Sequence, residues 1–182
     1  MQTKRITAPA ALAVSLVDAK VALRVNGAAL DAVITAWVQA ITEHAEHLTG
    51  RSIITQTWQA ICTSFDDLQK LPNLPVVSVS SVKYYDLTNA LQTLDPSNYS
   101  LFSVEYMATV RTFGAFPDTY ERDDAVVVEY VAGYGGTEAA TPAAVKAYIL
   151  AKLVEVFDPS NPPSVKGSFC DAVLARLRVP TL

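Results

Sequence analysis

One β-rich stretch near the middle of the chain decides the fold: Leu74-Pro75-Val76-Val77-Ser78-Val79-Ser80-Ser81-Val82-Lys83-Tyr84-Tyr85-Asp86. Valine and tyrosine are interleaved there with serine and lysine, a pattern typical of a strand with one buried face. Because prolines bound its start, we expect the strand to cover residues 76–85. The polar residues 86–90 that follow predict a hairpin connection.

Shorter β-type segments lie on both sides of this stretch. Strands are expected over residues 54–62, 91–94, 99–104, 109–113 and 125–131, where β-branched and aromatic residues recur between turn-forming residues. Together they predict a central, antiparallel, β-rich insertion over residues 53–131.

Helical patterns flank the β-rich insertion. Two N-terminal helices are expected over residues 15–50, the first capped by Ser15 and the second ended by Gly50. The second helix has apolar residues at spacings of three and four, which we expect to face the core. These residues are Leu30, Val33, Ile34, Trp37, Ile41, Ala45 and Leu48. Two C-terminal helices are expected over residues 142–182, joined by a linker over residues 161–164. The predicted class is α+β, in a single domain over residues 1–182.

Composition excludes several classes of protein. At 182 residues and 51% apolar side chains, the chain can bury a substantial core. It has 18 acidic and 14 basic residues and no basic run longer than Lys4-Arg5, so it lacks the charge pattern of a nucleic-acid-binding protein. Asp18 and Lys20 interrupt the N-terminal apolar stretch, which argues against a secretory signal. No run approaches the roughly 20 apolar residues of a membrane span.

No catalytic constellation is apparent in the sequence. His44 and His47 lie three residues apart on one predicted helix, but no third metal ligand accompanies them, and a solvated helix face with His44 packing at its edge is the favoured reading. Residues 133–136 lack the remaining signature of a phosphate-binding loop, and a glycine-permitted reversal is expected there instead. We therefore predict no catalytic residue, no metal and no cofactor.

Five segments, taken in order, carry a resemblance to a known family. They are residues 16–25, 46–58, 74–86, 128–135 and 142–146. This ordered set resembles the head–tail connector family of long-tailed bacteriophages, also called adaptor or head-completion proteins and found in prophages and gene transfer agents. The chain departs from the family pattern at residues 156–163, which leaves the geometry of the last helix undefined.

The resemblance implies a structural role and not an enzyme. It implies a helical connector core with a β-rich insertion, assembled into a closed ring of about a dozen subunits. Such a ring docks beneath the portal protein, extends the DNA channel without binding DNA specifically, and offers an attachment surface to the next neck or tail protein. The expected location is the neck of a virion, after synthesis in the cytoplasm of the host bacterium.

Three groups of residues are candidates for contacts in such an assembly. By similarity to related connectors, the last helix is expected to dock onto the portal; the residues concerned are Phe169, Val173, Leu174, Leu177 and Arg178. Candidate subunit contacts are Trp37, His44 and Trp58, although core packing is favoured for both tryptophans. An exposed loop near residues 113–123 is a candidate tail-side contact; its apolar residues are Phe113, Phe116 and Tyr120.

Two alternatives to the connector are also compatible with the sequence. One is another neck or tail-completion protein of the same class of particle. The other is a small ligand-binding module for a glycan or a peptide, whose groove would use the tyrosines of the predicted sheet. Ring formation would separate a connector from a monomeric binding module.

Overall fold

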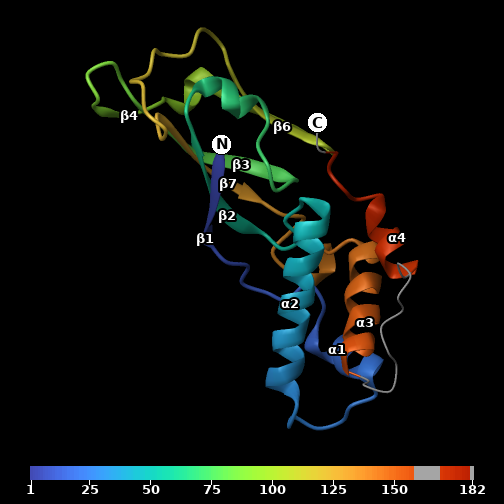
Figure 1. Cartoon of the computed structure of the whole chain (residues 1–182). Coiled ribbons are helices and arrows are strands. Elements are labelled where there is room, and N and C mark those ends of the chain that lie inside the picture. Colours follow the sequence, from blue (N-terminus) through green and yellow to red (C-terminus); the bar gives the residue numbers. More distant parts are fainter. Residues whose placement is uncertain (158–168, 181–182) are drawn as a thin grey trace. The chain divides into compact units, whose positions relative to one another are not determined.

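A computed structural model describes residues 1–157 and 169–180, and it has both helices and antiparallel sheet (Figure 1). The α+β class predicted from the sequence is therefore confirmed. The chain forms two compact units. The sheet unit comprises Met1–Ala8 and Thr55–Gly133, and the helical unit comprises Pro9–Ile54 and the described residues from Tyr134 onward.

The sheet unit is built on five antiparallel strands. Their order across the sheet is β1 (Gln2–Thr7), β2 (Gln56–Cys62), β7 (Val126–Ala132), β3 (Val76–Tyr85) and β4 (Leu91–Thr93). Strands β5 (Tyr99–Val104) and β6 (Met107–Thr112) form a separate two-stranded sheet. All of these strands except β1 were predicted, with ends that differ by at most two residues.

Strand β1 was missed because its sequence carries no strand pattern. All six of its residues are exposed, and they read Gln-Thr-Lys-Arg-Ile-Thr, without alternation of polar and apolar side chains. The strand is held through its backbone, which pairs with β2 from Gln2 opposite Ile61 to Thr7 opposite Thr57. The first eight residues therefore belong to the sheet unit.

The middle of the sheet shows the expected alternation. In β7, Val126, Val128, Tyr130 and Ala132 are buried, while the residues between them are half-buried. The Tyr130 hydroxyl donates to the Pro72 carbonyl at 3.1 Å. Burial raises the pKa of Tyr130, so the phenol stays protonated and keeps this hydrogen bond.

The hairpin between β3 and β4 is organised by one carboxylate. Asp86 Oδ1 accepts from the backbone N–H groups of Thr88 at 2.9 Å and Ala90 at 3.1 Å, and from the Thr88 hydroxyl at 2.6 Å. Its Oδ2 accepts from the Gln92 amide at 2.7 Å. These hydrogen bonds, the one from the Thr88 hydroxyl first, lower the pKa of Asp86 to about 2. The predicted hairpin connection is confirmed.

The helical unit contains α1 (Leu16–Leu23), α2 (Asp31–Thr49), α3 (Ala143–Phe157) and α4 (Phe169–Ala175). The Ser15 hydroxyl caps α1 by accepting from Asp18 N–H at 3.0 Å, and Gly50 ends α2 in the left-handed conformation, as expected. The linker expected over residues 161–164 lies outside the described residues. Within the described part of the chain, no helix is both long and apolar enough to cross a membrane.

A tight reversal joins the last strand of the sheet to α3. A β-carbon placed on Gly135 would lie 2.4 Å from that of Ala140, so only glycine fits there without a shift. Gly135 pairs with Ile54 in an isolated parallel bridge, and Tyr134 N–H donates to the Ile53 carbonyl at 3.0 Å. This agrees with the glycine-permitted reversal expected at residues 133–136.

The core of the helical unit is formed by one side of α2 packed with the other helices. The buried side of α2 differs in part from the predicted one. Val38 is buried, whereas Leu30, Val33 and Trp37, which were expected to face the core, are exposed. The prediction that Trp37 packs in the core is therefore wrong. The buried members of this core are Ala13, Val14, Ala19, Ile34, Val38, Ile41, Ala45, Ile53, Ile54, Val145, Tyr148, Ile149, Leu153 and Leu174.

Candidate assembly surfaces

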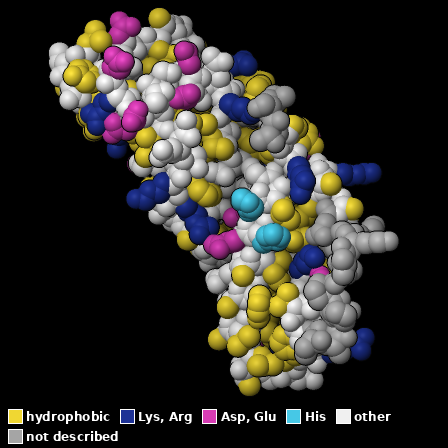
Figure 2. All heavy atoms as spheres, in the orientation of Figure 1, with side chains coloured by type: hydrophobic (Ala, Val, Ile, Leu, Met, Phe, Trp, Pro, Cys, Tyr) yellow, Lys and Arg dark blue, Asp and Glu magenta, His cyan; other side chains and the backbone are white. Residues whose placement is uncertain are grey.

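The outward face of α2 is mostly apolar and carries no charge between Asp31 and Glu43, although the Gln39 amide is also exposed. Val33 is 47% exposed and Trp37 is 41% exposed, and the alanines at 32, 36 and 40 are exposed beside them. A helix facing water normally carries charged side chains on its outer side. Figure 2 shows hydrophobic side chains gathered over this region, below the two histidines.

A shallow groove of about 260 Å³ lies between α2 and α3. Its lining includes Trp37, Ala40, His44, Tyr148, Lys152 and Val156. The Lys152 ammonium pairs with the Glu155 carboxylate at 3.0 Å, so its positive charge is neutralised. Most of the other lining side chains are apolar. The structure thus brings together two of the three predicted subunit-contact residues, Trp37 and His44.

Trp58, the third predicted subunit-contact residue, belongs to the sheet unit. It is half-buried on β2, where it stands opposite Arg5 of β1 and Tyr130 of β7. It therefore does not join the groove of the helical unit. The favoured core packing of Trp58 holds in part, because its side chain is neither fully buried nor fully exposed.

A second apolar surface lies on α1. Val17 is 71% exposed and Val21 is 72% exposed, one turn apart on the same side of the helix. They line a hollow of about 420 Å³ together with the cationic side chains of Lys20 and Arg24. Lys20 is tied to the start of α2 by an ion pair with Asp31 at 2.6 Å.

The predicted docking helix, α4, packs against its own helical unit. Leu174 is 1% exposed and belongs to the core, and Leu177 packs against that core. Two hydrogen bonds hold the segment just after α4 in place: Arg51 Nε donates to the Leu177 carbonyl at 2.6 Å, and Val179 N–H donates to the Thr49 carbonyl at 2.8 Å.

This packing corrects the expectation that the Leu174 side of α4 is free for a partner. A short helix buries its largest apolar side chains wherever a core is within reach, because that removes the most surface from water. Val173 is half-buried and Arg178 is exposed. The helix begins at Phe169, whose side chain lies outside the described residues.

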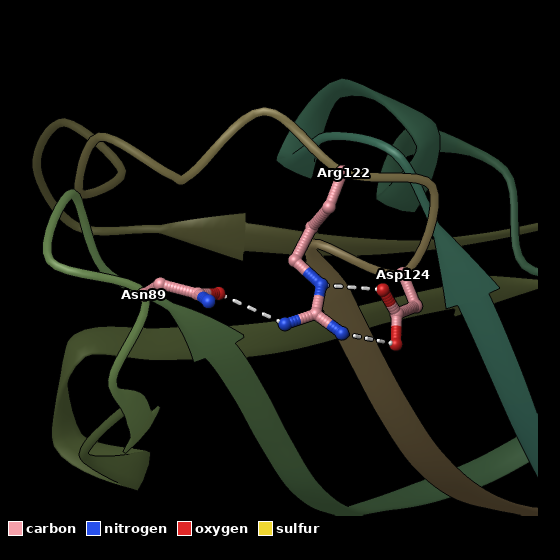
Figure 3. A network of polar contacts seen from close by, with 3 residues as sticks. All are labelled: Asn89, Arg122 and Asp124. Carbon is pink, nitrogen blue, oxygen red and sulfur yellow. Dashed lines mark hydrogen bonds and ion pairs between the residues drawn. The ribbon is translucent and has the colours of Figure 1, made fainter.

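The loop that follows β6 is held in place by Arg122. Its guanidinium binds both carboxylate oxygens of Asp124, at 2.5 and 2.9 Å, and donates to the Asn89 amide oxygen at 2.9 Å (Figure 3). It also lies over the Tyr85 ring, 3.6 Å from the centroid. The hydrogen bonds from Arg122 hold the pKa of Asp124 below its usual range.

The three aromatic residues predicted for this loop have different environments. Phe116 stacks on Phe65 with the ring centroids 4.4 Å apart, so it anchors the loop to the sheet unit. Phe113 is 75% exposed, and Tyr120 is 43% exposed while its N–H donates to the Tyr85 carbonyl at 2.9 Å. The loop therefore presents Phe113 and Tyr120 outward from a fixed base.

Some exposed apolar residues were not proposed as assembly contacts from the sequence. They are Val17 and Val21 on α1, Val33 on the outer face of α2, Val156 on α3, and Val104, Tyr106 and Met107 at the tip of the β5–β6 hairpin. For α2 the sequence did carry a signal of a second contact surface, because its apolar residues form two parallel lines along the helix. A helix that buries only one side needs only one such line. The hairpin tip carries no comparable signal.

No protein-family model matches this sequence, and neither does any curated protein. Solved structures do match the fold over the whole chain. A chain from the neck of an empty gene transfer agent (GTA) particle, computed with C6 symmetry, superposes with a TM-score of 0.84 at 17% identity. A chain from the virion of a native GTA particle gives 0.83 at 19%, and one from a native neck computed with C12 symmetry gives 0.82 at 18%. In each case the match covers 100% of this chain and 97% of the other. The chain thus has the fold of a GTA neck protein.

Proposed function

We propose that this chain is a structural subunit of a phage-type neck, a head–tail connector that forms a ring and has no catalytic role. One observation carries the proposal: the fold match to chains of GTA necks and virions covers 100% of this chain and 97% of each neighbour, at TM-scores of 0.82–0.84. Two of these assemblies have C6 or C12 symmetry, which is the symmetry of closed rings.

The surfaces of the molecule support an assembling role. The helical unit exposes apolar side chains on α1 and on α2, and the sheet unit exposes Phe113 on its loop and Met107 at its hairpin tip. Exposed apolar patches, such as the one on the α2 helix, are typical of proteins that bind other proteins. In the proposed ring, DNA passes through the channel without specific contacts, in keeping with a net charge of −4.

On the head side, we propose that the ring docks beneath the portal protein through the C-terminal segment. Since Leu174 is in the core, the docking surface is the outer side of α4 and the residues after it, including Val173 and Arg178. The informative substitution is therefore Arg178→Glu, which changes an exposed charge and leaves the core intact. It should weaken portal binding while ring assembly in the absence of portal is unchanged.

For the tail-side contact, we propose that the loop carrying Phe113 and Tyr120 attaches the next neck or tail protein. The loop has the features of an attachment site: two exposed aromatic side chains on a base held by Arg122 and Phe116. Phe113→Ser should reduce attachment of the tail-side protein. Leu87→Ser, a substitution at another exposed apolar position of the sheet unit, is the matched control.

The mass of the purified protein in solution tests the proposed function. Light scattering should be measured over a range of concentrations, with and without the portal protein of the same particle. Rings of about a dozen subunits, alone or on the portal, are the expected result. A 19.6-kDa monomer that never responds to the portal would overturn the proposal. The glycan- or peptide-binding alternative would then be the next to test, although Tyr99 and Tyr130 are buried and unavailable to a ligand.

A further inference from the structure

We propose that the two apolar surfaces of the helical unit are the two halves of one contact between neighbouring copies of this chain. The α2 face, defined as Val33, Ala36, Trp37 and Ala40, would pack on the α1 face, defined as Val17 and Val21, of the next copy. This inference rests on the proposed ring and deepens it by assigning the residues that join the subunits.

The first step is that the α2 face requires a cover. Between Asp31 and Glu43 the helix has no charged side chain, and apart from the exposed amide of Gln39 its outer side there is mostly apolar. Trp37, near the middle of that side, is 41% exposed above the groove between α2 and α3. A large aromatic side chain beside a hollow is the usual anchor of a protein–protein contact.

The second step is that a closed ring needs two different surfaces on each subunit. In a cyclic assembly of more than two copies, one surface of a subunit binds a different surface of its neighbour. The hollow beside α1 and the groove between α2 and α3 share no lining residue. Both belong to the helical unit, so one set of packed helices presents both halves of the contact.

The third step is that charged side chains border both faces and can fix the register of the contact. On α1, Arg24 is exposed beside Val21, Asp18 is exposed next to Val17, and Lys20 is paired with Asp31. In the groove beside the α2 face, Lys152 is paired with Glu155. Charges at the edges of an apolar contact favour one register between the partners.

The occupant is a second copy because the fold is that of chains solved in symmetric necks, where identical subunits stand next to one another. A self-complementary contact of the α2 face with itself would give a dimer and leave the α1 face uncovered. The pairing of unlike faces covers both in every subunit of a closed ring.

Charge insertion provides the first test, under the conditions in which the unaltered protein assembles, alone or on the portal protein. Trp37→Asp and Val21→Asp should each abolish the ring, because either one puts a carboxylate into the contact. Leu87→Asp is the matched control: Leu87 is 66% exposed in the sheet unit, and this variant should assemble normally. Unchanged circular dichroism melting of the single variants shows that they fold.

Disulfide trapping provides the second test and identifies which faces meet. In a Cys170→Ser background, the double variant with Val21→Cys and Trp37→Cys should give a ladder of cross-linked oligomers after oxidation; the remaining native thiol, Cys62, is buried. A mixture of the two single variants should give a covalent dimer, and each single variant alone should give no cross-linked product. Covalent dimers from Trp37→Cys alone would indicate α2 against α2 and overturn the inference.

The outcomes separate this inference from the proposed function. Rings that persist in both aspartate variants, or a double-cysteine variant that assembles without cross-linking, place the subunit contact elsewhere, for instance at the open edge of β1. The inference is then wrong while the connector function stands. If the unaltered protein forms no ring with or without the portal protein, the proposed function fails and the inference fails with it.

Discussion

The helical unit and the sheet unit both expose apolar side chains, but on different kinds of element. In the sheet unit, polar side chains at the loops are bound to one another: Asp86 organises one hairpin, and Arg122 joins Asp124 and Asn89. In the helical unit, the outer faces of α1 and α2 expose valines and a tryptophan. The difference teaches that exposed apolar residues of the sheet unit, such as Leu87 and Phe113, lie on turns and loops held by local hydrogen bonds, whereas those of the helical unit line helix faces that another molecule can cover.

The largest effect expected within this comparison separates two neighbouring apolar residues of α2. Ile34 is fully buried in the core, so Ile34→Ala should lower the free energy of unfolding by about 2–5 kcal/mol. Trp37→Ala, three residues along the same helix, should cost clearly less stability and instead reduce ring assembly. Urea unfolding followed by circular dichroism measures the first effect, and light scattering measures the second. Equal losses of stability in the two variants would contradict the assignment of the two sides of α2.

A smaller effect is expected in the middle of the sheet unit. Tyr130→Phe removes the hydroxyl that donates to the Pro72 carbonyl and leaves that acceptor without this partner. We expect a loss of about 1–3 kcal/mol in the free energy of unfolding, measured by urea unfolding. Tyr120→Phe is the control, because its side chain is partly exposed and its loss should be much smaller. A Tyr130→Phe variant as stable as the control would show that the buried hydrogen bond contributes nothing.

The smallest expected effect is local and depends on pH. The pKa of Asp86 is about 2, below its ordinary 3.8, so the ionised carboxylate stabilises the hairpin fully above pH 3.8. That contribution should be lost as the pH falls through about 2. The amide chemical shifts of Thr88 and Ala90, followed by NMR, should titrate in this range. In Asp86→Asn the titration should disappear; if it persists, another group is responsible.

The comparison also explains which parts could be predicted from the sequence. Strand β3 was predicted with its observed ends, Val76 and Tyr85, because prolines precede it and Asp86 follows it. The caps at Ser15 and Gly50 were predicted for the same reason, since each depends on residues only a few positions away. The expected ring and partner contacts come from the family resemblance alone. The comparison with solved structures shows a neck-type fold.

The remaining parts depend on residues that are distant in the sequence. Strand β1 forms because the edge of β2 provides backbone hydrogen bonds to it. The six residues of β1 do not by themselves indicate that β2 is their partner. Leu174 was predicted to lie on an exposed docking face, but it is buried in the core of the helical unit. Arg51 stabilises the turn that follows by donating to the Leu177 carbonyl. The groove that joins Trp37 to His44 likewise needs α3, which begins about 100 residues later in the chain.

The sequence by itself determined the α+β class, the strands of the sheet unit other than β1, and the caps of α1 and α2, because these follow from apolar periodicity and from hydrogen bonds between near neighbours. Only the tertiary structure decided which side of α2 is buried. Two apolar lines, one through Ile34 and Val38 and the other through Val33 and Trp37, satisfy the helical spacing equally well. The packing of α1, α3 and α4 covers the first line and leaves the second exposed, because one core can bury only the side of the helix that faces it.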